Sequence, residues 1–88
     1  MKAKVKIKKT FKIKLRNIIV ISVDILFGKV NNGDSILFDD IPVEIKSIEF
    51  VDYTNEKRSE LGLAIESNDE NKEILKLLNE NDCFEIRD

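Results

Sequence analysis

Hydrophobic and polar residues alternate with a period of two along the first part of the chain. Val5 and Ile7 stand between lysines, and residues 11–15 repeat the pattern with basic residues between apolar ones. Successive side chains of a strand point to opposite faces, so this pattern predicts strands with one face in the core and one in water. Leu15 is expected to share the core face. Residues 9–10 interrupt the phase between the two runs.

The middle of the chain is expected to continue as strands joined by turns. Residues 18–27 are apolar on both faces, as in a central strand. Asn32 and Gly33, followed by Asp34, predict a tight hairpin turn with positive φ at two successive positions. Gly28 is expected at a bend or bulge. The strand positions predicted to be buried are Val20, Ile25, Ile36, Val43, Ile45, Leu63 and Ile65.

The later segments complete the expected fold. A phase slip at residues 46–47 predicts a bulge, which is how a sheet coils into a barrel. Residues 74–78 have helical spacing, with an N-cap expected among residues 67–69, and residues 83–86 read as a last strand. We therefore expect a mainly β fold. Residues 1–88 should form a single small barrel of six or seven strands, with one short helix near the C-terminus.

The composition narrows the possible chemistry. The chain has 88 residues and no His, which excludes Ser-His and Cys-His nucleophile systems and zinc sites with imidazole ligands. Cys83 is the only cysteine, so no internal disulfide forms, and we expect it to serve as a packing residue. The longest unbroken apolar run is far shorter than the roughly 18–20 residues of a membrane span. We expect a soluble, cytoplasmic protein that is not an enzyme and uses no metal, cofactor or nucleotide.

Charge is distributed unevenly along the chain. Eight of the 15 basic residues precede the first acidic residue, Asp24, which leaves seven basic and 17 acidic residues in the remainder. Such a basic stripe either binds an anionic partner or solvates a strand face and protects an edge from aggregation. One aromatic residue of a polar loop completes the candidate partner-binding surface. Its members are Lys4, Lys6, Lys8, Lys12, Lys14, Arg16 and Tyr53.

One segment has a recognisable pattern. Residues 16–34 read Arg-Asn, then Ile-Ile-Val-Ile-Ser, and finally Gly-Lys-Val-Asn-Asn-Gly-Asp. This resembles the second, β-barrel domain of elongation factor Tu and related translational GTPases. There, an Arg-Gly, an apolar strand and a Gly-x-[Ile/Val]-x-x-Gly-Asp segment build the first half of the barrel. Residues 43–49, 61–65 and 77–86 are similar to the later strands in the same order, so the resemblance covers about residues 11–87.

The resemblance implies a free-standing, non-catalytic binding module whose partner is a protein or an RNA. The sequence has no Gly-x-x-x-x-Gly-Lys-Ser/Thr loop, and Gly28-Lys29 belongs to a turn. Relatives that grip aminoacyl-tRNA carry a basic residue where this chain has Val51 and Asp52, so recognition of the tRNA end is not implied. The lysines leave a second hypothesis open. In that hypothesis the chain is an accessory or inhibitory protein-interaction domain that docks on an acidic partner.

Overall fold

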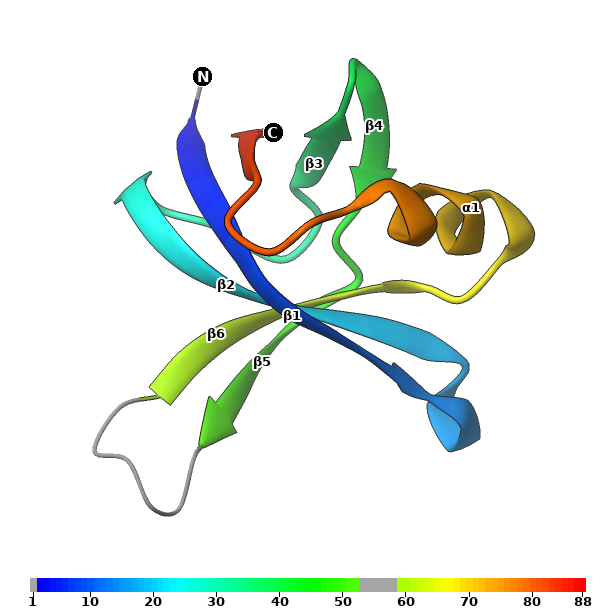
Figure 1. Ribbon diagram of the computed structural model, residues 1–88. Coiled ribbons are helices and arrows are strands. Elements are labelled where there is room, and N and C mark those ends of the chain that lie inside the picture. Colours follow the sequence, from blue (N-terminus) through cyan, green and yellow to red (C-terminus); the bar gives the residue numbers. More distant parts are fainter. Residues whose placement is uncertain (1, 53–58) are drawn as a thin grey trace.

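A computed structural model of the chain describes residues 2–52 and 59–88. These residues form a seven-stranded antiparallel sheet and one α-helix (Figure 1). The strand order is β4-β3-β7-β1-β2-β6-β5. The mainly β fold, the seven strands and the helix near the C-terminus are thus confirmed. The elements are β1 (Ala3–Ile13), η1 (Lys14–Arg16), β2 (Ile18–Gly28), β3 (Ser35–Phe38), β4 (Ile41–Glu44), β5 (Ser47–Asp52), β6 (Ser59–Glu66), α1 (Asp69–Leu77) and β7 (Cys83–Arg87).

The sheet is strongly bent but not closed. Its edge strands β4 and β5 pair with β3 and β6 respectively, and within the described residues they do not pair with each other. The predicted irregularity at residues 46–47 coincides with the break between β4 and β5. There the Lys46 N–H donates to the Ala64 carbonyl oxygen at 2.7 Å, which ties the break to β6.

The main hydrophobic core draws side chains from six of the seven strands. Most of the residues predicted to be buried are buried, namely Val20, Ile36, Val43, Ile45, Leu63 and Ile65. Five of these six belong to the main core, together with side chains from β1, β2 and β7. Val20 is instead on the opposite face, beside the buried Ala64 of β6. Phe11, its partner in β1, is half-buried on that face.

The prediction that Ile25 is buried is wrong, because 42% of its surface is exposed. β6 accompanies β2 only as far as Val23, which pairs with Leu61. The last residues of β2 extend beyond that neighbour and pair only with β1 among the described strands. Ile25, Leu26 and Phe27 therefore lose the cover that buries the first half of the strand.

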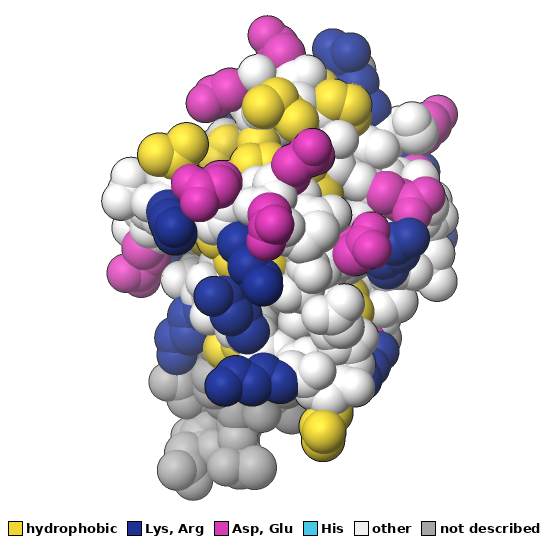
Figure 2. Space-filling view, turned by 90° about the vertical axis from the view of Figure 1, so that its right-hand side faces the viewer, with side chains coloured by type: hydrophobic (Ala, Val, Ile, Leu, Met, Phe, Trp, Pro, Cys, Tyr) yellow, Lys and Arg dark blue, Asp and Glu magenta, His cyan; other side chains and the backbone are white. Residues whose placement is uncertain are grey.

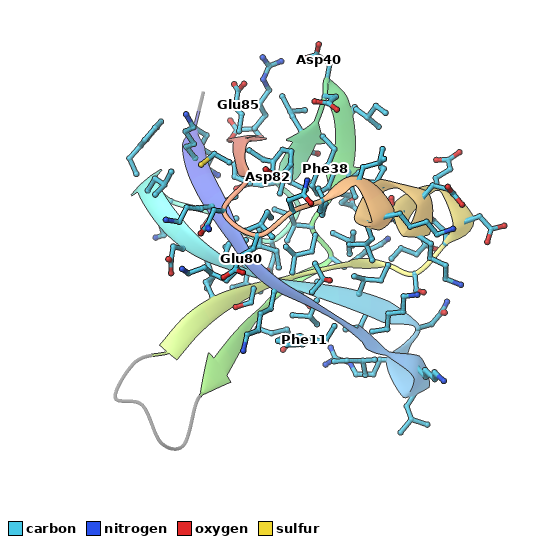
Figure 3. All side chains as sticks on the ribbon, viewed as in Figure 1. Phe11, Phe38, Asp40, Glu80, Asp82 and Glu85 are labelled. Carbon is cyan, nitrogen blue, oxygen red and sulfur yellow. The ribbon has the colours of Figure 1, made fainter. Side chains whose placement is uncertain are left out.

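The turns also differ from the expectation. Asn32 and Gly33 do not close a hairpin, because β2 pairs with β1 and β6 while β3 pairs with β4 and β7. Of these two residues only Gly33 has positive φ, and the Asp34 N–H closes the turn on the Asn31 carbonyl oxygen at 3.1 Å. The two-residue hairpin lies between β3 and β4 instead. Figure 3 shows Asp40 at its tip.

Helix α1 begins at the predicted place. Asn68 is the N-cap, and its side chain accepts a hydrogen bond from the Asn71 N–H at 2.8 Å. The Asn71 side chain is buried and donates to the Glu66 carbonyl oxygen at 2.8 Å. These two bonds fix the start of the helix against the end of β6. α1 consequently lies beside the β3–β4 hairpin (Figure 1).

Candidate functional site

The first lysines of the candidate surface lie on the outer face of β1. Lys4 and Lys6 alternate with the buried Val5 and Ile7 and are half-buried themselves. Lys4 is paired in register with Glu85 of β7, and Lys6 with Asp24 of β2 and Cys83 of β7. Acidic neighbours on both flanking strands thus reduce the positive potential of this part of the stripe.

A bulge at Lys8 divides the lysine stripe between two faces. The register shifts between Ile7 and Lys9, so that Lys12 pairs with Ile19, a residue of the main core. Directly opposed residues of antiparallel strands lie on the same face, and an inserted residue reverses the faces beyond it. Lys12 is therefore on the opposite face from Lys6, and the expectation that all six basic residues project from one side is wrong. Lys8 forms an ion pair with Asp24 at 3.4 Å.

The chain turns at the end of the β1–β2 hairpin. Residues 12–16, which we term the hairpin end, comprise the last two residues of β1 and η1. The Asn17 N–H donates to the Lys14 carbonyl oxygen at 3.2 Å, and Asn17 has φ +53°. Leu15 is 100% exposed, so the prediction that it lies on the core face is wrong. The strand ends at Ile13, and the 3-10 turn directs the Leu15 side chain to solvent. Among the described residues, no ion pair involves Lys12 or Lys14.

Arg16 differs from Lys12 and Lys14 of the hairpin end because its side chain forms an ion pair with Glu49. Its guanidinium donates to Glu49 Oε1 at 2.7 Å, and the same oxygen accepts from Ser47 Oγ at 3.2 Å. The hydrogen bond from Arg16, followed by that from Ser47, holds the pKa of Glu49 below its usual range. Arg16 thus joins the hairpin end to β5. Tyr53, the aromatic member of the candidate surface, lies outside the described residues.

A groove between the β3–β4 hairpin and α1 has a composition that the sequence did not reveal. Its larger hollow has a volume of about 510 Å³ and a second hollow about 310 Å³, and Ile41 and Ile74 line both. Ile41 is 54% exposed and Leu77 75% exposed. We call this region the acidic groove, because its larger hollow is also lined by Glu44, Glu66, Glu70 and Glu73.

One basic side chain, Lys46, also lines the larger hollow. It forms an ion pair with Glu44 at 3.1 Å. The hydrogen bond to Glu44, with the charges of Glu44 and Glu66, raises the pKa of Lys46. The net charge of the lining therefore remains negative. The sequence pattern did not indicate this groove, because Leu77 was counted among the apolar positions of the helix.

Figure 2 shows the face that carries both surfaces. Hydrophobic side chains with acidic ones around them gather in the upper part, over the side of the molecule where α1 lies in Figure 1. Lys and Arg side chains gather in the lower part of the same face, over the side where β1 turns into β2. The hairpin end and the acidic groove thus occupy opposite ends of one face.

The remaining candidates do not assemble into reactive chemistry. Cys83 is exposed rather than packed, because it begins β7 on the outer face, and its thiol lies 3.6 Å from the Asn81 carbonyl oxygen. Across residues 2–52 and 59–88, no group of three His, Cys, Asp or Glu side chains could hold a metal ion. In the same residues, no helix is long and apolar enough to cross a membrane.

The proposed turn residues have structural roles. Gly28 has φ +83° and lies against the backbone of Lys2 and Ala3, and Gly33 has φ +88°. Asn32 is exposed in the turn before Asp34, which is buried.

No family model matches the chain, and comparison with curated proteins and with solved structures gives no significant match.

Proposed function

We propose that the chain is a non-catalytic binding module of the translation-protein barrel type that docks on an acidic protein surface through its hairpin end. The observation that carries this proposal is Leu15, a wholly exposed leucine between Lys14 and Arg16. Isolated exposed apolar residues are common, but this one lies at the tip of a hairpin among positive charges. An apolar side chain in a pocket supplies affinity, and surrounding charges supply orientation.

The surroundings of the hairpin end favour a protein partner over RNA. Proteins that bind single strands without sequence preference stack bases on exposed aromatic side chains. Phe11 is the described aromatic residue nearest to the hairpin end in sequence, and it is half-buried beside Val20. Acidic neighbours also accompany Lys4 and Lys6, which reduces the length of continuous positive surface that could follow a phosphate backbone.

The barrel type is proposed from the resemblance to the translational GTPases and from the structural roles of the segment that carries most of that resemblance. The Gly-x-Val-x-x-Gly-Asp pattern supplies two glycines with positive φ, a buried valine and a buried aspartate. The seven strands form one bent sheet (Figure 1), and the link between β4 and β5 is hydrogen-bonded to β6. These features support a barrel in which the functional surface lies on the loops and hairpins.

The proposal is tested by comparing three proteins in capture from the source cell with quantitative mass spectrometry. They are the wild type, a Lys14→Glu/Leu15→Ser variant, and a Lys29→Glu control, which alters an exposed lysine between β2 and β3. We expect a stoichiometric protein partner that the hairpin variant loses at least about tenfold and the control retains. Equal capture by all three proteins would overturn the proposal.

A second measurement tests the RNA alternative directly. Each protein is titrated into a fluorescent single-stranded RNA of about 20 nucleotides at several salt concentrations. We expect binding weaker than about 10 µM near physiological salt, because few phosphates would be contacted. Tight binding whose salt slope is unchanged by Lys14→Glu/Leu15→Ser would assign the function to RNA and to another surface.

A further inference from the structure

The acidic groove has the features of a receptor for an apolar side chain with basic neighbours. Ile41 and Ile74 are shared by its two hollows, and Leu77 remains 75% exposed beside them. Four glutamates and one paired lysine line the larger hollow, and Asp39 and Asp82 line the smaller one. An occupant that matches this lining carries an apolar tip and positive charges.

The edge strand beside the groove favours side-chain docking over strand addition. In a two-residue hairpin the flanking residues, Phe38 and Ile41, form a hydrogen-bonded pair. The backbone nitrogen of Pro42 is then directed to the free edge of β4, where it offers no N–H. A peptide that paired with β4 as an additional strand would lack the hydrogen bond that a backbone N–H at position 42 would donate. An inserted side chain needs no backbone donor.

The hairpin end of this same chain has the required composition. Leu15 projects fully into solvent, Lys14 adjoins it, and neither Lys12 nor Lys14 has an ion-pair partner among the described residues. The hairpin end and the acidic groove lie at opposite ends of one face (Figure 2). A face that is basic at one end and acidic at the other is complementary to a second copy of itself, related by a two-fold axis that lies in the contact plane and is perpendicular to the line joining the two ends.

We propose that the occupant of the acidic groove is the hairpin end of a second copy of this chain, in a two-fold symmetric dimer. Each copy places Leu15 in the groove of the other, between Ile41 and Leu77, with Lys14 beside the groove glutamates. Both contacts form at once, so the assembly closes at two copies. This inference rests on the proposed function, because it names the partner of the same hairpin end.

The expected strength of the dimer follows from the separate contributions of the ion pairs and of the inserted leucine side chains. Ion pairs at an exposed rim contribute little affinity, whereas an apolar side chain removed from water contributes more. Two leucine insertions and a set of rim charges correspond to a small interface, and small interfaces give weak, reversible association. We expect a dimer with Kd on the order of 10–100 µM.

Sedimentation equilibrium of the full chain, from about 1 µM to about 1 mM, tests the proposal with single substitutions. Leu15→Ser alters a side chain with full solvent exposure, so folding is unaffected, and we expect association at least about tenfold weaker. Lys14→Glu and Glu73→Lys should each weaken the dimer, because each places like charges at both symmetric contacts. Lys29→Glu, the same charge change away from this face, should dimerise as the wild type does.

Mixing the two weakened variants gives the decisive result. In a mixed dimer one contact is reversed in both partners and the other is native in both, so each contact again joins opposite charges. We therefore expect an equimolar mixture of Lys14→Glu and Glu73→Lys to associate more tightly than either variant does alone. A wild type that remains monomeric at about 1 mM overturns the dimer, and so does a mixture that associates no more tightly than the two variants alone.

The outcomes separate this inference from the proposed function. If the wild type is monomeric but Lys14→Glu/Leu15→Ser loses a captured protein, the hairpin end docks on another protein and the dimer alone is wrong. If the substitutions alter neither association nor capture, the hairpin end is not a docking surface and both proposals fail.

Discussion

At the residue scale, Gly28 occupies a place that no other residue fits. Its φ is +83°, and a Cβ built on it would overlap the Lys2 carbonyl oxygen and lie 2.7 Å from the Ala3 Cα. Gly33 has a similar φ of +88°, but nothing lies within 4 Å of the corresponding position. Both glycines therefore have a strained φ for any other residue, but only Gly28 also lies too close to neighbouring backbone for a Cβ atom.

We expect Gly28→Ala to destabilise the protein by about 3 kcal/mol or more, since both the left-handed φ and the overlap with β1 act against it. Gly33→Ala should cost about 1 kcal/mol, from φ alone. Urea unfolding of the two variants measures the difference. Equal losses of stability would show that Gly28 does not lie in close contact with the backbone at the start of β1.

Asp34 is the second residue whose environment has a measurable consequence. It is 6% exposed, and its Oδ2 accepts from Lys2 Nζ and from the Asn31 N–H, each at 2.7 Å. Burial raises the pKa of this carboxyl, but the hydrogen bonds from Lys2 and Asn31 outweigh it and leave the pKa below its ordinary value. The hydrogen bond to Asp34 likewise raises the pKa of Lys2.

The sign of this shift predicts the dependence of stability on acid. The lowered pKa means that the Asp34 carboxylate stabilises the fold above the unfolded pKa of about 3.9, and this contribution is lost as pH falls through the folded pKa. Asp34→Asn should therefore be less stable than the wild type at pH 7, and the difference should shrink as pH falls below about 4. Thermal unfolding at several pH values measures it. A difference independent of pH would contradict the ion pair.

At the element scale, the β3–β4 hairpin shows how turn chemistry decides a local structure. Asp39 and Asp40 have φ +49° and +69°, as the central residues of a type I′ turn require. The sequence pattern predicts this conformation for Asn32-Gly33, which is the stronger local signal. Aspartate tolerates the left-handed region less well than glycine, so this turn is strained where Gly33 is not.

We expect Asp40→Gly to raise the melting temperature by about 2–4 °C, because the gain at the turn exceeds the entropy added to the unfolded chain. Asp40→Ala, which keeps a Cβ and removes the carboxylate, should lower it. The reverse order of the two melting temperatures would show that residue 40 is not in the left-handed region.

Period-two alternation predicted strands well, because burial of one face is a local property of the sequence. It marked an interruption at residues 9–10, close to the bulge at Lys8, but did not predict that the faces reverse there, and it found most of the core. It failed for Ile25 and Leu15, whose exposure depends on where neighbouring strands end. It also missed the acidic groove, which Ile41 and Ile74 form only when α1 lies beside the hairpin. Such contacts between distant segments have no signature in a single sequence.

At the scale of the whole molecule, charge and exposed apolar residues are arranged together. Much of the positive charge precedes Asp24, and the fold brings the end of that segment onto the face that also carries the acidic groove. Association through this face should weaken with salt, but only modestly, because Leu15 carries most of the affinity. We expect Kd to rise by no more than about tenfold from 50 to 500 mM salt, as measured by sedimentation. A much steeper dependence would indicate purely electrostatic binding.

The most direct test of the central claim, that the hairpin end docks in a matching groove of a second copy, is hydrogen exchange at two concentrations. Backbone amides of the full chain are compared at about 5 µM and about 500 µM, below and above the expected Kd. We expect slower exchange at the higher concentration in residues 14–17 and in α1, and the same rates at the exposed end of β2. Rates that do not depend on concentration in those two segments, or protection confined to residues 25–28, would contradict it.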